Sequence, residues 1–347
     1  MTNLHDIRVI APNFKRRLSG VTATIVRLVP VQARDIAIVA TGPVLPAHVP
    51  QIPLRALLTL PRKTRRVWHA RRNVEMIGGL VLKYLLGKNL KLLFTSASQR
   101  KQTGLTRWLI RRMDAVVATS DKTAAYLERP ATVIMHGIDL EGYAPAPAPD
   151  RAALRAKLGL PVEGLLIGCY GRIRRSKGTD LFYAAMAGVN KCFPAHALIM
   201  GRAVPKDQKF LQQIKDGVEN EGLTERVHFL PEVPVEEMAD WYRVLDIYVA
   251  PQRSEGFGLT PIEAMACGVP VIATRVGAFE QIVTPQTGML VDINDPAALM
   301  NAICEAFEPP APIKEWAKHA RPHVAEHFSI EREAAQLITL YRKLLNA

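Results

Sequence analysis

The most constraining stretch of the sequence runs from Ser254 to Ala273, where a glycine-rich loop leads into a short helix and then a buried strand. Gly256 and Gly258 let the backbone adopt positive φ and approach a ligand closely. A loop that runs into a helix N-terminus presents unpaired N–H groups and a partial positive charge. The stretch therefore predicts a site for an anion such as a diphosphate.

The helix in this stretch has a predicted start and a predicted end. Thr260 is expected to be the N-cap, Pro261 the first helical residue and Glu263 the acidic member of a capping box. Gly268 ends the helix, and residues 269–273 are predicted to form a buried strand. Capping alone is a sufficient explanation of Glu263.

Glu255 needs a different explanation, because it lies eight positions before Glu263, inside the glycine loop. Two carboxylates that flank such a loop can accept hydrogen bonds from hydroxyl groups. Sugar and ribose rings offer hydroxyls in pairs, so a sugar-containing ligand is a reasonable expectation.

The length of 347 residues favours two domains, and a composition of 48% hydrophobic and 6% aromatic residues is typical of an α/β enzyme. The four cysteines include no C-x-x-C pair, so we expect buried thiols in a reducing cytosol rather than zinc ligands or disulfides. The sequence shows no signal-peptide pattern and no apolar run of about 18 residues, so no membrane span is expected.

Strands alternate with helices along the chain, which predicts parallel, doubly wound sheets. A strand at residues 6–12, a loop and a helix from Val21 to Val29 form a Rossmann-like start without the G-x-G-x-x-G fingerprint. The proline-rich segment 144–150 is expected to be a stiff linker. We therefore expect an α/β protein with two Rossmann-like domains, 1–145 and 151–328, and a last helix within 329–347.

Two cations follow the first predicted strand of the second domain. Arg172 and Lys177 lie in a Gly-Arg-x-x-x-x-Lys-Gly segment at the carboxyl end of that strand. Ligands bind at this end of open α/β sheets, and an arginine fork with a lysine point charge suits a diphosphate. A solvated charged turn is the alternative interpretation of the same segment.

Together these features resemble the retaining GT-B glycosyltransferases of family 4. The resemblance depends on Glu255 and Glu263 with seven residues between them, on the segment from Gly171 to Gly178, and on Gly137-Ile138-Asp139. It implies two domains that face a cleft, an N-terminal domain for the acceptor and a C-terminal domain for a nucleotide-sugar donor. It also implies that the last helix crosses back to the N-terminal domain.

The resemblance assigns roles to individual residues. Arg172, Lys177 and Glu255 are expected to be catalytic, with both cations stabilising the leaving nucleoside diphosphate. Glu255 is expected to contact the hexose and Glu263 the ribose, in a same-face displacement that retains the anomeric configuration. No cofactor or metal is expected, because the cations are built in and Asp-x-Asp is absent. The expected donor-binding residues are Gly20, Gly171, Arg172, Lys177, Glu255, Gly256, Phe257, Gly258, Leu259, Thr260 and Glu263.

The expected acceptor-binding residues are Lys15, Arg16, Arg17, His69 and Arg71. Many members of the family carry His-x-His after the strand at residues 67–69 and a further His after the next strand. Here the first position reads His69-Ala70-Arg71 and the second has no His. His69 is therefore either a direct contact or a supporting residue.

Residues 18–22 and 68–76 and the basic N-terminal half resemble the lipopolysaccharide core mannosyltransferases of alphaproteobacteria. This implies GDP-mannose as donor and an anionic lipopolysaccharide core, or another lipid-linked molecule, as acceptor. Three alternatives stay open: a UDP-glucose or UDP-galactose transferase, a GT-B nucleotide-sugar epimerase, and a nucleic-acid binder. The last leaves both glutamates unused, and no nucleic-acid motif is found, so nucleic acid is not an expected partner.

The net charge of +13 is unevenly distributed. Residues 1–155 carry 25 Lys or Arg and 9 Asp or Glu, a net +16, whereas residues 156–347 carry 20 and 23, a net −3. A basic half of this kind suits an anionic membrane surface, so we expect a cytoplasmic protein bound peripherally to the cytoplasmic face of the inner membrane. The expected membrane patch consists of Arg62, Lys63, Arg65, Arg66, Arg107, Arg111 and Arg112.

Overall fold

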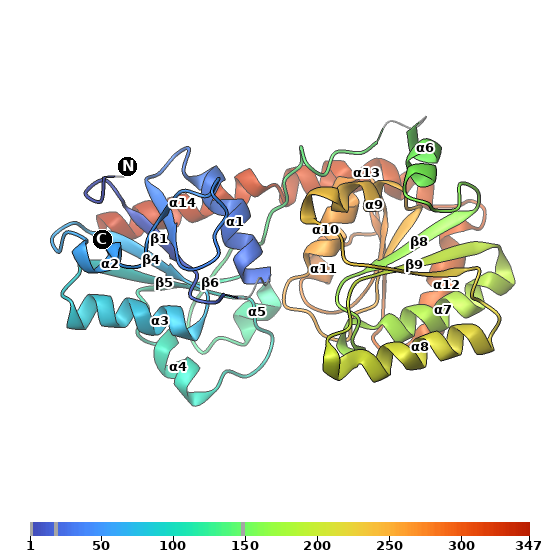
Figure 1. The fold of residues 1–347 in the computed structure, drawn as a ribbon, viewed down its shortest axis with the longest axis horizontal. Helices are drawn as coiled ribbons and strands as arrows, with labels where there is room; N and C mark the ends of the chain where they lie inside the picture. Colours follow the sequence, from blue (N-terminus) through green and yellow to red (C-terminus); the bar gives the residue numbers. More distant parts are fainter. Residues whose placement is uncertain (1–2, 17–19, 147–149) are drawn as a thin grey trace. The chain divides into compact units, whose positions relative to one another are not determined.

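The computed structural model describes residues 3–16, 20–146 and 150–347, which form two compact units (Figure 1). Unit 1 comprises Met1–Gly137 and Ile330–Ala347, and unit 2 comprises Ile138–Ser329. The boundary precedes the predicted linker, because two arginines of unit 2 bind the backbone carbonyls of residues 143 and 144, at the start of the linker. Arg321 donates to Tyr143 O at 3.1 Å and Arg243 to Ala144 O at 2.6 Å. Residues 147–149 of the linker lie outside the described residues.

Unit 1 is built on a parallel sheet with the strand order β3-β2-β1-β4-β5-β6-β7. Its elements in chain order are β1 (Val9–Pro12), α1 (Gly20–Gln32), β2 (Ile38–Thr41), β3 (Gln51–Ile52), α2 (Ala56–Thr59), β4 (Arg66–Ala70), α3 (Asn73–Leu80), the π-helical turn η1 (Val81–Leu85), β5 (Leu90–Ser96), α4 (Gly104–Ile110), β6 (Ala115–Ala118), α5 (Asp121–Ala125), β7 (Thr132–Val133) and α14 (Ile330–Asn346).

The central strands of the unit 1 sheet are buried on both faces, which explains why they are mostly apolar. Val67 and Leu93 point to a cluster that includes residues of α1 and α14. Trp68 and Leu92, their neighbours in sequence, point to the opposite cluster, which includes residues of α3 and α4. The period-2 alternation of strand side chains thus separates the core into two layers.

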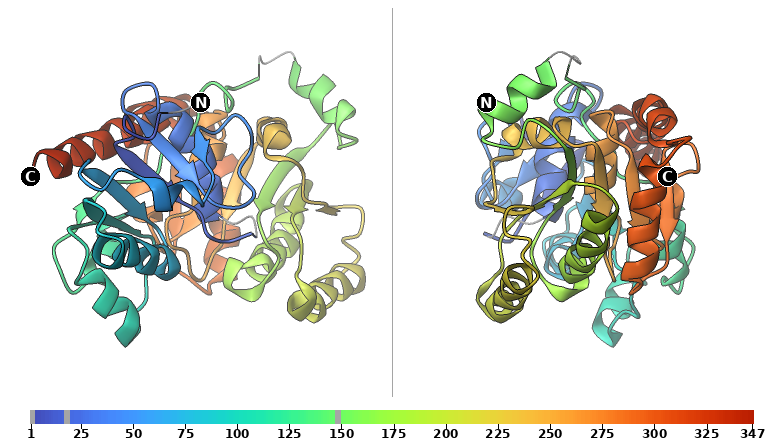
Figure 2. Two further views of the ribbon diagram at one scale, coloured as in Figure 1. Left: turned by 60° about the vertical axis from the view of Figure 1, so that its left-hand side comes forward. Right: turned by 90° about the vertical axis from the view of Figure 1, so that its right-hand side faces the viewer.

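Helix α14, which is last in sequence, lies beside α1 in unit 1 (Figures 1 and 2). Its Glu333 accepts hydrogen bonds from His136 Nδ1 and Gly137 N, both at 2.8 Å. Burial raises the pKa of Glu333, but the His136 interaction and the Gly137 N–H outweigh burial and hold the pKa below its ordinary value. The amphipathic C-terminal helix predicted from the sequence is therefore an integral part of the first sheet domain.

Unit 2 contains a parallel sheet with the strand order β10-β9-β8-β11-β12-β13. Its elements are α6 (Asp150–Lys157), β8 (Leu165–Tyr170), η2 (Arg175–Lys177), α7 (Thr179–Cys192), β9 (Ala195–Met200), η3 (Pro205–Asp207), α8 (Gln208–Asn220), β10 (Val227–Leu230), η4 (Val235–Glu237), α9 (Met238–Arg243), β11 (Ile247–Ala250), α10 (Leu259–Ala266), β12 (Val271–Thr274), α11 (Phe279–Ile282), β13 (Gly288–Val291), α12 (Pro296–Phe307) and α13 (Ile313–His327).

The doubly wound fold predicted from the alternation is confirmed in both units. The helices α6, α8, α11 and α13 and the strand β13 of unit 2 were not predicted from the sequence. Helix α6 begins at Asp150, which had been assigned to the linker. Helices α7, α8 and α12 cover one face of the second sheet (Figure 1).

Candidate functional site

The candidate donor site lies at the carboxyl ends of β8 and β11, which are neighbours in the second sheet. From β8 the chain adds β9 and β10 towards one edge of the sheet, and from β11 it adds β12 and β13 towards the opposite edge. This reversal makes the β8–β11 pair a topological switch point, where ligands bind in open α/β sheets. Arg172 and Lys177 follow β8, and Glu255 follows β11.

The loops that follow these two strands are held together by a short hydrogen-bond network. Arg253 N and Ser254 N donate to Ser176 O at 3.0 and 3.3 Å. The Arg253 guanidinium also binds both carboxylate oxygens of Asp180, in the first turn of α7, at 2.6 and 2.9 Å. Bidentate arginine–carboxylate pairs fix geometry, so this pair sets the spacing of the two loops. Neither Arg253 nor Asp180 was identified as a site residue from the sequence.

Two glycines in these loops adopt positive φ, and Gly178 makes the close approach of the two loops possible. Gly178 has φ +73°, and a Cβ atom there would lie 1.8 Å from Pro251 O. Gly258 has φ +90°, and a Cβ atom there would lie 2.2 Å from Phe279 Cε1. Both positions require glycine for conformation and for space.

Lys177 forms an ion pair with Glu255, and the two side chains are 21% and 19% exposed. Glu255 Oε1 also accepts a hydrogen bond from Gly256 N at 2.9 Å. Arg172 is exposed, and its guanidinium makes no ion pair with any residue that the structure describes. The predicted cations and Glu255 are thus brought to one sheet edge, with Lys177 neutralised and Arg172 open to solvent.

Glu263 does not belong to the capping box predicted from the sequence. Helix α10 begins at Leu259 with Gly258 as its N-cap, so Thr260 and Pro261 lie inside the first turn. Glu263 instead accepts a hydrogen bond from the buried Tyr242 hydroxyl at 2.8 Å. Burial, followed by the Glu263 charge, raises the pKa of Tyr242 well above its ordinary value. The glycine loop, with its positive φ at Gly258, displaces the helix start by two residues.

The other predicted donor residues differ in accessibility. The Phe257 side chain is 4% exposed, so this residue can meet a ligand mainly through its backbone. Gly171 is exposed at the end of β8, and Gly256, Leu259 and Thr260 are half-buried. Gly20 begins α1 in unit 1 and is exposed.

His69 is buried in unit 1, and both of its ring nitrogens are hydrogen-bonded. Its side chain is fully buried, with Nδ1 2.7 Å from the Tyr341 hydroxyl of α14 and Nε2 2.6 Å from Thr95 Oγ1. Burial, followed by the nearby Arg71 charge, holds the pKa of His69 well below its ordinary value. This environment contradicts the expectation of a direct acceptor contact, because the ring is inaccessible and links two strands to α14.

Of the other predicted acceptor residues, Lys15, Arg16 and Arg71 lie beside the carboxyl ends of β1 and β4. Lys15 and Arg16 are exposed, Arg71 is half-buried, and Arg17 lies outside the described residues. The Arg71 guanidinium donates to His69 O at 3.3 Å. These are the central strands of unit 1, where β1 and β4 form the switch point of that sheet.

A buried polar network at this switch point was missed from the sequence. Arg72 Nη1 lies 2.7 Å from Glu75 Oε1 and 2.9 Å from Asn13 Oδ1, and Thr22 Oγ1 donates to Asn13 Oδ1 at 3.1 Å. Asn13, Thr22 and Glu75 are at most 1% exposed. One signal was available, since Asn13 and Arg72 each follow a central strand, as Arg172 does in the second domain.

The predicted basic patch is only partly available on the surface. Arg66 is 1% exposed, and its guanidinium donates to the carbonyls of Pro61, Thr64 and Leu4. This contradicts its assignment to a membrane patch, because the side chain braces loops inside unit 1. Arg65 donates to Leu345 O at 3.1 Å, whereas Arg62 and Lys63 are exposed.

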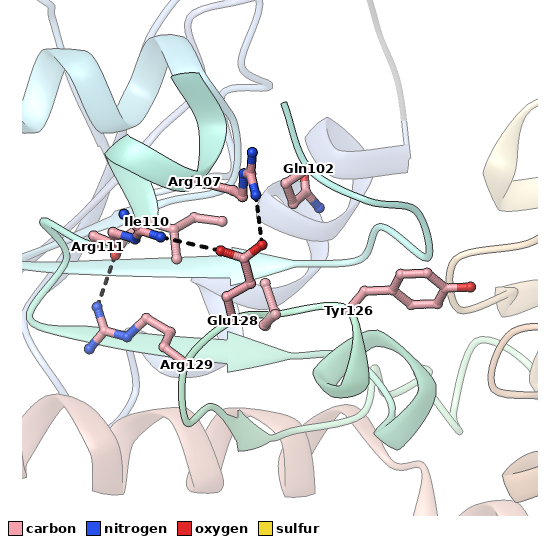
Figure 3. A pocket seen from close by; sticks show the side chains of 8 residues that line it. Gln102, Arg107, Ile110, Arg111, Tyr126, Glu128 and Arg129 are labelled. Carbon is pink, nitrogen blue, oxygen red and sulfur yellow. Dashed lines mark hydrogen bonds and ion pairs between the residues drawn. The ribbon is translucent and has the colours of Figure 1, made fainter. Parts of the chain in front are cut away.

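Arg107 and Arg111 of the patch are paired with one carboxylate. Figure 3 shows both arginines directed at Glu128, at 2.9 and 3.4 Å, beside a small hollow at the α4–α5 edge. The hydrogen bond from Arg107 is the main cause that holds the pKa of Glu128 below its ordinary value. The exposed Arg112 stacks instead on Trp108, with its guanidinium carbon 3.6 Å from the ring centroid.

Large apolar side chains are exposed along α3, η1 and α4, which we call the apolar stripe. The spacing of its first members is that of one helix face, and Lys83 lies over the Tyr84 ring at 5.7 Å. The stripe consists of Val74, Ile77, Val81, Tyr84, Leu85, Leu105 and Trp108, which are between 42% and 78% exposed.

The described residues include no group of three or more His, Cys, Asp or Glu side chains arranged to hold a metal ion. Among residues 3–16, 20–146 and 150–347, no helix has both the length and the apolar character needed to cross a bilayer.

Comparison with known proteins places this arrangement in a family. Residues 164–308 match the family described as "Glycosyl transferases group 1". The chain is 47% identical to the lipopolysaccharide core biosynthesis mannosyltransferase LpcC of Rhizobium leguminosarum bv. viciae, over 99% of both proteins. It is 44% identical to the mannosyltransferase LpsB, of the same description, from Rhizobium meliloti (strain 1021), over 99% of this chain and 100% of that protein.

The fold also matches a solved structure. The crystal structure of HepE from Anabaena in complex with UDP superposes with a TM-score of 0.84 at 17% identity, covering 97% of this chain and 100% of that one. This agreement confirms the predicted GT-B fold. Because the family match and the full-length similarity agree with the geometry at the sheet edge, we conclude that the chain belongs to the group 1 glycosyl transferases and is a glycosyltransferase.

Proposed function

We propose that this enzyme transfers mannose from GDP-mannose to the lipopolysaccharide core with retention of the anomeric configuration. The observation that carries the proposal is the similarity, over nearly the whole chain, to two proteins named lipopolysaccharide core mannosyltransferases. Unit 2 is assigned to the donor, because the cations and carboxylates gather at its switch point. Unit 1 is assigned to the acceptor, through Lys15, Arg16, Arg17 and Arg71.

Arg172 and Lys177 are proposed to bind the donor diphosphate and to stabilise the charge that develops on it as the bond to the sugar breaks. The exposure of Arg172 at the carboxyl end of β8 supports this contact. Lys177 would share its charge between the diphosphate and Glu255, its partner in the structure. The Arg253–Asp180 pair holds the two loops in register and so keeps both groups in position.

Glu255 and Glu263 are proposed to accept hydrogen bonds from donor hydroxyls, the first from the hexose and the second from the ribose. Glu263 is oriented by the Tyr242 hydroxyl, which leaves its carboxylate with further acceptor capacity. Glu255 lies in the loop at the start of α10, between the cations and the helix N-terminus. The acceptor hydroxyl would attack from the face that the diphosphate leaves, and the departing phosphate would take its proton.

The decisive experiment compares nucleotide sugars with the purified protein and a truncated lipopolysaccharide acceptor. GDP-mannose should give a product with an α-mannosidic linkage by NMR, and should raise the melting temperature more than UDP-glucose or UDP-galactose. A product from a UDP-sugar alone would support that transferase instead. Conversion of the donor to its epimer without acceptor would support an epimerase.

Because the proposed charge stabilisation comes from side chains, we also propose that no metal is required. Turnover should be the same in EDTA as in magnesium or manganese. Loss of turnover in EDTA, with recovery on adding either metal, would contradict this part of the proposal.

We further propose that unit 1 attaches peripherally to an anionic membrane through the apolar stripe. Exposed apolar patches rimmed by charge are characteristic of interaction surfaces, and Lys83 and Arg112 stack on stripe rings. The exposed Arg62 and Lys63 lie on the loop that contacts Asn89, just after η1. Basic residues contribute roughly 1 kcal/mol each near an anionic surface, and apolar side chains add affinity by insertion.

Vesicle sedimentation tests the attachment. Phosphatidylglycerol vesicles should bind the protein at low salt and more weakly at high salt, and phosphatidylcholine vesicles should bind little. Leu85→Asp and Trp108→Asp should weaken binding, whereas Val235→Asp, at a position of unit 2 whose exposure lies between those of the other two, should not. Equal binding to both lipids, or equal effects of all three variants, would contradict the assignment.

A further inference from the structure

Two of the four cysteines meet on the face of unit 2 that is formed by α7 and α12. Cys192 is the last residue of α7 and is exposed, whereas Cys304 of α12 is 7% exposed. Their sulfur atoms lie 3.3 Å apart. The remaining cysteines, Cys169 and Cys267, are buried elsewhere in the unit.

The close approach of the sulfur atoms follows from the packing of the two helices. Gly188, one turn before Cys192, packs against Met300, one turn before Cys304. A Cβ atom at Gly188 would lie 2.1 Å from Met300 Sδ, so glycine allows the helices to come close at this level. Beyond the cysteines, the Phe193 and Phe307 rings make an edge contact at 5.5 Å, which closes the same seam. The two thiols are therefore held face to face by the core.

The exposed thiol opens into a hollow of about 380 Å³ that is lined in part by Lys191, Cys192 and Arg226. The two cations give this hollow a positive charge, which attracts anionic reagents. Glutathione disulfide is an anionic oxidant small enough to reach an exposed thiol in such a hollow. Burial raises the pKa of Cys304 to about 12, so Cys192 is the group that reacts first.

We propose that Cys192 and Cys304 form a reversible thiol modification site, which glutathione disulfide converts to an internal disulfide. In the first step the Cys192 sulfur attacks the glutathione disulfide, whose S–S bond breaks, and a Cys192–glutathione disulfide forms while one glutathione leaves. In the second step the Cys304 sulfur attacks Cys192 and expels the second glutathione. The two protein thiols lose two electrons and two protons, which the two released glutathione molecules carry.

The proposed thiol site does not depend on the proposed transferase activity. The expected effect of oxidation is a covalent link between two helices. A Cys192–Cys304 bond would join the end of α7 to α12 and close a loop between positions 112 residues apart. The other end of α7 carries Asp180, which holds Arg253 and the donor loops. Oxidation would therefore fix the helix that supports those loops.

Peptide mapping of the full-length protein tests the proposal. After treatment with glutathione disulfide at pH 8, non-reducing mass spectrometry should find the peptides of Cys192 and Cys304 linked, and dithiothreitol should separate them. Cys304→Ser should instead accumulate glutathione on Cys192, and Cys192→Ser should remain unmodified at Cys304. Cys267→Ser, a matched change at a buried cysteine, should behave like the wild-type protein.

Two results would overturn the proposal. One is a wild-type protein that keeps its circular dichroism spectrum and forms no Cys192–Cys304 link. The other is modification of Cys169 and Cys267 at the same rate as Cys192, which would mean that the cysteine pair has no special reactivity.

Discussion

At the scale of single residues, the proposed donor site combines one cation that is already paired with one that is open to solvent. Lys177 is bound to Glu255, whereas Arg172 has no ion-pair partner within the described residues. Substitution of Arg172 should therefore separate function from stability more cleanly than substitution of Lys177, which would also leave Glu255 without its partner.

Arg172→Ala should lower kcat/KM at least about tenfold, because a charge-assisted hydrogen bond is worth roughly 1.5–3 kcal/mol. Its melting temperature should equal that of the wild-type protein. The matched control is Lys314→Ala, at an exposed cation of α13, which should change neither quantity. Unchanged turnover in Arg172→Ala would remove this residue from the donor site.

His69 should make the stability of unit 1 pH-dependent. Its pKa in the folded protein lies below the ordinary value of 6.5. Below pH 6.5 the ring is therefore protonated in the unfolded chain while it is still neutral in the folded protein. The contribution of the neutral ring is complete above pH 6.5 and declines as the pH falls below it. His69→Gln should cost about 1–3 kcal/mol at pH 7.5 for the disturbed hydrogen bonds.

The difference between the wild-type protein and His69→Gln should shrink as the pH falls towards 5. Urea titrations at several pH values would measure it. The other histidines with lowered pKa values, His196, His228 and His323, are present in both proteins, so their effects cancel in the comparison. A difference that stays constant from pH 5 to 8 would show that His69 does not titrate with folding.

At the scale of elements, the site depends on how closely the loops after β8 and β11 approach each other. Gly178 and Gly159 both have positive φ, at +73° and +67°, but only Gly178 would place a Cβ atom against another backbone. Gly159→Ala should cost about 1–2 kcal/mol for the left-handed conformation alone. Gly178→Ala should cost more and should also lower kcat/KM, because the loop that carries Lys177 must move.

Thermal unfolding and steady-state kinetics of both variants would check this prediction. Equal destabilisation by the two alanines would mean that the loops yield easily, and the proposed role of their close contact would then be incorrect.

At the scale of the whole molecule, the chain closes unit 1 with its last helix. Ile330, Leu337 and Tyr341 of α14 belong to the buried cluster that includes α1 and the first sheet. A fragment of residues 1–137 should therefore fail to fold. A fragment of residues 138–329 contains a complete core and should fold alone.

Circular dichroism and thermal unfolding would test both fragments, and GDP-mannose should raise the melting temperature of the 138–329 fragment. An unfolded 138–329 fragment, or a cooperatively folded 1–137 fragment, would contradict this division. A 138–329 fragment that folds but is stabilised by no nucleotide sugar would support the domain division and contradict the assignment of the donor site to unit 2.

The sequence by itself determined the two parallel sheets and the family, and it placed the candidate donor residues at the carboxyl ends of two strands. These conclusions depend on patterns that can be read directly along the chain. The patterns are the alternation of strands with helices and the spacing of Arg172, Lys177, Glu255 and Glu263. Only the tertiary structure decided which of these groups are paired and which are accessible. The burial of His69 and Arg66 and the Cys192–Cys304 contact depend on residues distant in sequence. Desolvation and close packing arise only when distant segments pack together in the core, so they cannot be read from one segment of the sequence.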